Sequence, residues 1–255
     1  MKKIILSLMT ASMLLVGCGK SNKDDSSSNN TTTEELGTIL IDPGHGAKNK
    51  SGIIDNGATS PDGEYIEGEI NYKAAKYLGA YLETKGVTVV YTREEVSDLE
   101  ETEYTNDAGV AQYNDLRARA EMGPSVNADY FVSLHCDNIV GSGQKSGYHI
   151  YYHKDYIDSK ELATSIHSAL KDAGYKPQSE ELATDATGGE YRVIRLNQVP
   201  AILIEMGFLN GSDIDYLTDD EKLEAFIKVV GDGIVSKMKA GKSDPDAKFT
   251  IQPDI

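Results

Sequence analysis

The sequence predicts a single α/β domain, built on a mostly parallel, twisted sheet with helices on both faces. Short apolar runs typical of buried strands alternate along the chain with longer segments of helical periodicity. The segment 37–240 is long enough to enclose one hydrophobic core, and it contains no internal repeat. We therefore expect one domain over 37–240.

The first expected elements are a strand, a helix and a second strand. The apolar run Ile39 to Ile41 lies within TILIDPGHG, where the Gly/Pro cluster predicts a turn after the strand. Apolar residues at helical spacing predict a helix over 67–85, which ends before Gly86. Residues 87–91 (VTVVY) form the next expected strand. Residues 94–113 are acidic and irregular.

The second half of the chain continues the alternation. A short helix over 116–122 is expected to end at Gly123-Pro124, because proline disfavours a helical conformation in the residue before it. The remaining expected elements are strands at 128–134, 148–152 and 199–206 and helices at 159–173 and 219–238.

The N-terminus is predicted to be a targeting segment. Lys2 and Lys3 precede a mostly apolar stretch over 4–16, which is typical of a signal peptide and too short for a membrane span. The following LVGC resembles the lipobox of bacterial lipoproteins, which implies cleavage before Cys18 and lipidation of Cys18. The alternative is an ordinary secretory signal with a chance cysteine. Residues 1–17 are thus the predicted lipoprotein signal peptide.

The predicted mature protein is held at the extracytoplasmic face of the cell membrane by its lipid. Residues 18–36 are a polar, Ser/Thr/Asn-rich flexible linker, and 241–255 form a C-terminal tail. With Cys18 lipidated, Cys136 has no partner for an intramolecular disulfide. The net charge of −16 argues against nucleic acid as a partner. We expect a monomer.

Three expected strands end on or just before a side chain that can bind metal. These side chains are His45, His135 and Glu205. Ligands of open α/β sheets bind beyond the carboxyl ends of the strands, which parallel strands place at one edge. Each histidine alone could be a hydrogen-bonded structural residue. Glu205, within AILIEMGF, needs a cation, a proton or a catalytic task, since burying an unpaired carboxylate costs several kcal/mol.

A fourth candidate lies at the expected start of the first helix. The helix macrodipole favours an ionised carboxylate at Glu67. Glu64 and Glu69 are its rivals, and spacing alone does not choose between the three.

The motifs together resemble a known family. They are, in order, TILIDPGHG (38–46), EGEIN (67–71), YTR (91–93), LRAR (116–119), NADYFVSLH (127–135) and VPAILIEMGFL (199–209). This set resembles the zinc-dependent N-acetylmuramoyl-L-alanine amidases, which cut bacterial peptidoglycan. The resemblance covers the whole expected domain and implies a phosphorylase/hydrolase-like fold.

The resemblance also implies roles for individual residues. His45, Glu67 and His135 would hold Zn²⁺, with Glu67 preferred because it stands four residues before Asn71 of the helix. Two imidazoles and one carboxylate leave an open position, as catalytic zinc sites do. Glu205 would be the general base that takes a proton from a zinc-activated water. The bond cut would join the lactyl group of N-acetylmuramic acid to L-Ala of the stem peptide.

The two arginines of the motifs, Arg93 and Arg119, match recurrent arginines of the family. They are possible substrate or supporting residues, as is Asn71, and structural ion pairing is the alternative to a catalytic role. Two other functions stay open: a zinc carboxypeptidase-type amidohydrolase on the same fold, and a non-catalytic wall-binding lipoprotein.

Other side chains in the sequence are further candidates for ligands or substrate contacts. Cys136 adjoins His135, but adjacent strand residues point to opposite faces. His149 and His153 are four residues apart on a strand, about 13 Å, which is too far to share a metal. Either histidine could face a substrate cleft, but we expect both at the protein surface. The candidates for sugar or peptide contacts are Tyr65, Tyr148 and Tyr191.

Overall fold

The computed structural model describes residues 35–48, 53–94, 103–105, 111–113, 115–138, 145–185 and 191–241, all within one compact unit. The predicted signal peptide, nearly all of the linker and the tail beyond Gly241 lie outside these residues. A search of the described helices for one that is both long and apolar enough to cross a membrane finds none.

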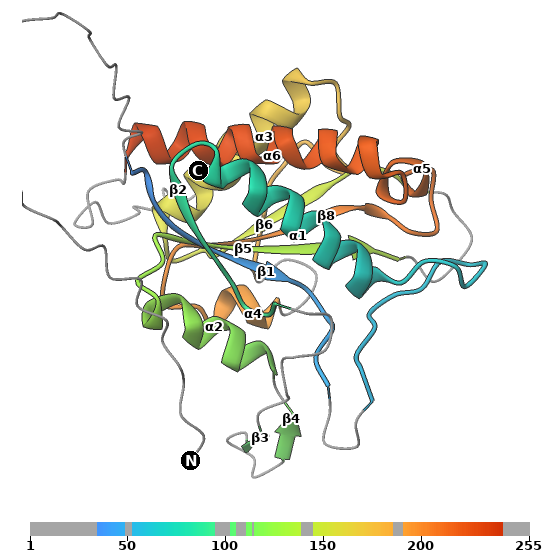
Figure 1. Cartoon of the computed structure of the whole chain (residues 1–255), viewed down its shortest axis with the longest axis horizontal. Coiled ribbons are helices and arrows are strands. Elements are labelled where there is room, and N and C mark those ends of the chain that lie inside the picture. Colours follow the sequence, from blue (N-terminus) through green and yellow to red (C-terminus); the bar gives the residue numbers. More distant parts are fainter. Residues whose placement is uncertain are drawn as a thin grey trace, which may run out of the picture. The chain divides into compact units, whose positions relative to one another are not determined.

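The core of the domain is a six-stranded sheet in the order β2-β1-β5-β8-β6-β7 (Figure 1). Its first four strands are parallel, β6 is antiparallel to β8, and β7 is parallel to β6. The predicted mostly parallel sheet is therefore confirmed. The strands are β1 (Gly37–Pro43), β2 (Val87–Tyr91), β5 (Tyr130–Asp137), β6 (His149–Tyr152), β7 (Ala183–Thr184) and β8 (Ala201–Phe208).

Helices cover both faces of this sheet, as predicted. Figure 1 shows α1 (Glu67–Glu83), α3 (Ile157–Asp172) and α6 (Asp220–Ala240) on one face. The opposite face carries α2 (Asp115–Ser125) and α4 (Arg192–Arg195), and the short α5 (Ile214–Leu217) follows β8.

Alternation along the strands divides the core into two apolar layers. On β8, Ile202 and Ile204 belong to the cluster that packs with α1, α3 and α6, whereas Ala201 and Leu203 belong to the cluster beside α2 and α4. Glu205 is the next residue in the alternating series of Ala201 and Leu203. The alternation therefore places the Glu205 side chain on the face that also carries α2 and α4.

Two parts of the sequence analysis need correction. The segment 94–113, expected to be irregular, contains β3 (Glu103–Thr105) and β4 (Ala111–Tyr113), an antiparallel pair separate from the main sheet. The prediction that the helix after it ends at Gly123-Pro124 was also wrong, because α2 continues to Ser125. Proline is tolerated there because Gly123 has no Cβ to clash with its ring. The carbonyls of Gly123 and Pro124 accept from Ala128 N and Asn127 N.

A buried polar network fixes the end of β1, from which the His45 turn departs. The carboxylate of Asp42 is fully buried and accepts hydrogen bonds from Thr92 Oγ1 (2.6 Å), Ser133 Oγ (2.6 Å) and Arg119 Nη1 (2.7 Å). Burial favours the protonated form, but the Arg119 charge and the hydroxyl donors hold the pKa of Asp42 below its usual value. The network therefore joins the ends of β1 and β2 to β5 and α2.

Candidate metal centre

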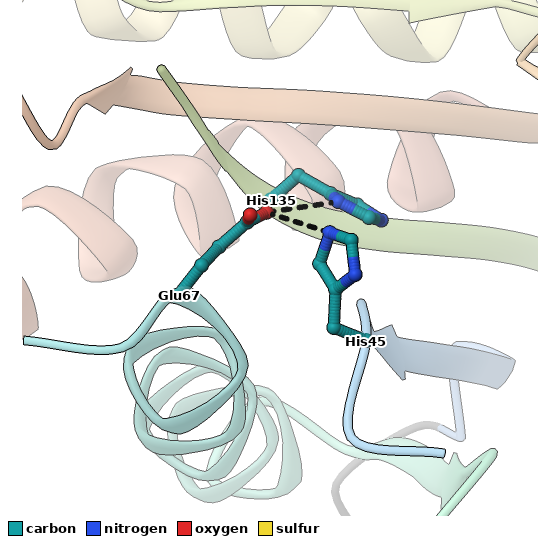
Figure 2. Close-up of side chains that lie close together, drawn as sticks. All are labelled: His45, Glu67 and His135. Atoms are coloured by element: carbon teal, nitrogen blue, oxygen red, sulfur yellow. Dashed lines mark hydrogen bonds and ion pairs between the residues drawn. The ribbon is translucent and has the colours of Figure 1, made fainter. Parts of the chain in front are cut away.

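Three of the predicted site residues converge at the carboxyl edge of the parallel strands. His45 lies in the turn after β1, Glu67 is the first residue of α1, and His135 lies near the end of β5. Figure 2 shows both imidazole rings next to the Glu67 carboxylate. The structure therefore brings together side chains from three separate segments of the chain.

The distances within this cluster suit a metal ion. Glu67 Oε1 lies 3.2 Å from His45 Nε2 and 3.1 Å from His135 Nδ1. One ligand atom from each residue lies within 4.8 Å of the other two. Zinc bonds of about 2.0–2.1 Å in a tetrahedron would separate ligand atoms by roughly 3.3 Å. His45, Glu67 and His135 could thus hold a metal ion of this size.

Glu67 is fixed by donors on both carboxylate oxygens. Oε2 accepts from Ala58 N (2.8 Å), whereas Oε1 accepts from Cys136 N (3.1 Å) and Asn71 Nδ2 (3.3 Å). Burial disfavours the ionised form, but hydrogen bonds to the two imidazoles hold the pKa of Glu67 well below its usual range. The site thus presents a negative charge to a cation.

The two rival carboxylates do not reach this cluster. Glu64 and Glu69 are exposed, whereas Glu67 is 3% exposed and faces both histidines. The sequence left the choice open because all three glutamates lie near the helix start. In the structure, a hydrogen bond from Glu67 N to Ala58 O fixes the start of α1, and this placement of the helix puts Glu67 at the cluster.

The His45 ring is oriented by a residue that the sequence analysis missed. Asp55 Oδ2 lies 2.8 Å from His45 Nδ1, so Nε2 is the nitrogen that faces Glu67. Burial alone would lower the pKa of His45, but Asp55 and Glu67 raise it to about 10. A carboxylate behind the far nitrogen is usual for metal-binding histidines. No spacing rule distinguishes Asp55 from the other acidic residues of its loop.

The backbone of this turn is unusual, and two arginines support it. His45 has φ of 61°, in the left-handed region that non-glycine residues seldom adopt. Arg119 donates to the carbonyls of His45 (2.5 Å) and Pro43 (2.9 Å), and Arg93 donates to those of Pro43 (3.1 Å) and Gly44 (3.3 Å). Both guanidinium groups are buried, and Arg119 also forms an ion pair with Asp42. Both arginines therefore hold the turn that carries His45; Arg93 also donates to Gly68 O (3.1 Å), and Arg119 also donates to Asp115 Oδ2 (2.8 Å).

Two glycines leave room for the three side chains. A Cβ on Gly44 would lie 2.2 Å from His135 Nε2, and a Cβ on Gly57 would lie 2.5 Å from Glu67 Oε2 and from His45 Cδ2. Gly57 also has φ of +68°. Any larger side chain at either position would displace the cluster.

Glu205 lies beside the cluster and outside it. It is paired in register with His135 on the neighbouring strand, so both side chains lie on the same face of the sheet. The side chain is half-buried, and its Oε2 has no hydrogen-bond partner among the described residues. Burial, followed by the charges of Glu67 and Asp137, raises the pKa of Glu205 well above its usual value. The carboxyl therefore binds a proton more readily than an exposed glutamate does.

Three other residues that the sequence suggested as ligands or contacts do not belong to the cluster. Cys136 is part of the apolar core on the opposite face from His135, and burial raises the pKa of its thiol. The surface position expected for His153 was wrong: it is 5% exposed and packs against Tyr156. Tyr148 is 1% exposed and lies in the core, where a substrate cannot touch it.

Three other candidate residues, two tyrosines and a histidine, are half-buried. Tyr65 and Tyr191 are half-buried, so contacts to a sugar or peptide stay possible for both. His149, expected at the surface, is also half-buried, and its cross-strand partner is Glu205.

The fold and the cluster together define a class of protein. Two imidazoles and a carboxylate at the carboxyl edge of a parallel sheet, with a second carboxyl beside them, are the arrangement of a metal-dependent hydrolase. The sequence matches the N-acetylmuramoyl-L-alanine amidase family over residues 39–236, and the chain belongs to this family.

Individual relatives agree with this assignment. The chain is 30% identical over 202 residues to the N-acetylmuramoyl-L-alanine amidase LytC of Bacillus subtilis, covering 78% of this chain and 35% of that protein. It is 31% identical over 206 residues to the probable cell wall amidase LytH of Staphylococcus saprophyticus, covering 80% and 57%. The chain thus spans only about a third to somewhat over half of these proteins.

A solved structure gives the same fold. The CwlD amidase from Clostridioides difficile, solved in complex with the GerS lipoprotein, superposes with a TM-score of 0.63 at 28% identity. The match covers 80% of this chain and 98% of that one.

The contact between Gly44 and His135 leads to a prediction about metal affinity. Gly44→Ala should push the His135 ring away from Glu67 and weaken metal binding, measured with Zn²⁺ as the probe, about 10–100-fold, as changes around metal ligands do. Competition with a chromophoric chelator measures the affinity, and far-UV circular dichroism checks the fold. Gly68→Ala is the matched control, because its Cβ would meet its nearest atoms at 3.4 Å. Unchanged affinity in folded Gly44→Ala would contradict the prediction.

Proposed function

We propose that this protein is a zinc-dependent N-acetylmuramoyl-L-alanine amidase that hydrolyses peptidoglycan. The bond cut is the amide between the lactyl group of N-acetylmuramic acid and L-Ala of the stem peptide. The observation that carries the proposal is the convergence of His45, Glu67 and His135 at one sheet edge, with Glu205 beside them on the same edge. Membership of the amidase family supports the choice of substrate.

Each residue of the site has a role in this reaction. His45, His135 and Glu67 would hold the zinc ion. A bound zinc ion lowers the pKa of water to about 7 and polarises a carbonyl group. Glu205 acts as the general base: it takes a proton from the attacking water and passes it to the leaving amine nitrogen.

The supporting residues keep this arrangement in place. Asp55 fixes the His45 ring, and Asn71 orients Glu67. Arg93 and Arg119 are turned toward backbone carbonyls of the His45 turn. A carboxypeptidase would need a cationic group to bind the free carboxylate of its substrate. These contacts do not favour either arginine for that task.

The products of digestion test the reaction. The purified protein, loaded with Zn²⁺, should release stem peptides that carry a new L-Ala amino terminus from peptidoglycan. Mass spectrometry of the soluble products identifies the cut. Shortened peptides with an intact lactyl amide would instead support the carboxypeptidase reading, and an absence of any cleavage would support a non-catalytic wall-binding protein.

The role of Glu205 is tested by an isosteric change. Glu205→Gln removes the proton acceptor and should lower kcat about 10²–10⁴-fold, the usual contribution of a general base. Zinc content, measured by atomic absorption, should stay at the wild-type level because Glu205 is outside the cluster. Glu69→Gln is the control, since Glu69 is an exposed carboxylate near the start of the same helix as Glu67. Near-normal kcat in zinc-loaded Glu205→Gln would remove Glu205 from this role.

We also propose a location for the protein. The LVGC sequence supports lipidation of Cys18 and attachment to the extracytoplasmic face of the cell membrane. The Ser/Thr/Asn-rich composition of residues 19–35 is that of a polar tether between Cys18 and the domain.

The lipid anchor is tested by removing its attachment site. Cys18→Ser should shift the protein from the membrane pellet to the soluble extracytoplasmic fraction, because no acyl chain can then be attached. Immunoblotting of the separated fractions measures the distribution. Membrane retention equal to that of the unaltered protein would refute lipidation at Cys18.

A further inference from the structure

His149 lies next to the proposed general base because of the direction of its strand. β6 is antiparallel to β8, so its first residue lies at the edge where the parallel strands end. His149 is paired in register with Glu205, and Glu205 is paired on its other side with His135. Directly paired residues point to the same face of a sheet, with Cβ atoms about 4.5–5.5 Å apart. Glu205 thus has an imidazole on each side.

Both members of the His149–Glu205 pair have a buried polar atom without a partner. Among the described residues, neither His149 Nε2 nor Glu205 Oε2 has a hydrogen bond. Leaving such atoms unpaired is costly in a protein interior. An imidazole nitrogen and a carboxyl oxygen are complementary, since one proton placed between them satisfies both.

The rest of the His149 ring is already engaged. Its Nδ1 lies 3.2 Å from Gln178 Oε1, and its ring packs on Tyr151 with centroids 4.6 Å apart. Tyr151 in turn packs on Tyr191 at 3.9 Å. These contacts hold the ring in place and leave Nε2 as the nitrogen available to Glu205.

Among the described residues, the hydroxyls of Tyr151 and Tyr191 also lie near Glu205, but they are hydrogen-bonded to each other. The charged groups that act on Glu205 are Glu67, Asp137 and His45. The two carboxylates repel its charge. Both nitrogens of His45 already face carboxylates, Nδ1 facing Asp55 and Nε2 facing Glu67.

We propose that His149 is a positioning residue for Glu205. The proton of the neutral His149 ring lies on Nε2, which donates to Oε2 of Glu205, fixes the carboxylate and leaves Oε1 for the reacting groups. Nδ1 then accepts from the Gln178 amide, turned so that its NH₂ group faces the ring. This inference rests on the proposed function, because it takes Glu205 as the base. It adds a residue that belongs neither to the metal cluster nor to the family motifs.

Two substitutions of His149 test the positioning role in the zinc-loaded full chain. His149→Phe keeps a ring to pack on Tyr151 but removes the nitrogen. It should lower kcat about ten-fold and leave KM within about two-fold, as expected for loss of one hydrogen bond in the transition state. His149→Gln restores an amide donor and should recover most of kcat. The control is His167→Phe, whose imidazole contacts Tyr148. Wild-type kcat in His149→Phe would overturn the proposal.

A measurement independent of activity tests the contact itself. In the zinc-loaded full chain, the imidazole ¹⁵N resonance of His149 Nε2, assigned by its loss in His149→Phe, should move in Glu205→Leu and change little in Glu205→Gln. An unchanged resonance in Glu205→Leu would overturn the proposed contact. If the wild-type chain does not cleave peptidoglycan, the proposed function fails, while this measurement still decides whether His149 and Glu205 are bonded.

Discussion

The candidate site depends on one buried carboxylate, that of Glu67. An ionised carboxylate is costly to bury unless donors surround it, and here they come from three segments: the loop at Ala58, the strand at Cys136 and the helix at Asn71. Both imidazoles approach the same oxygen of Glu67. The start of α1, the end of β5 and the turn after β1 are therefore fixed relative to one another by the requirements of a single charge.

The candidate metal cluster and the proposed base are supported in different ways. His45 has a left-handed backbone conformation. Such a conformation persists in a non-glycine residue only where its surroundings impose it. Here two buried arginines do so through hydrogen bonds to backbone carbonyls. Glu205 needs no such support, because it lies within a strand that has a neighbour on each side. One half of the site thus relies on a braced turn and the other on the sheet.

Much of the fold was predictable because its signals are local. Apolar runs, helical periodicity and Gly86 mark most elements within a few residues, and the strand ends indicated His45, His135 and Glu205. The missed features depend on contacts between distant segments. Nothing local distinguishes Asp55 or Gly57 from the other residues of their loop. A strand sequence also does not encode its direction in a sheet, so His149 was expected at the surface although it faces Glu205.

The reversed direction of β6 also affects how the region around Glu205 can change. Because β6 begins at the edge where β5 ends, the connection between Asp137 and His149 starts and finishes at that same edge. Loop-closure entropy grows slowly with length, by about 0.6 kcal/mol for each doubling. Insertions in this connection therefore leave the pairing of the strands intact. The length of this connection beside Glu205 can therefore vary at little thermodynamic cost, while the paired strands that carry His135 and Glu205 stay constant.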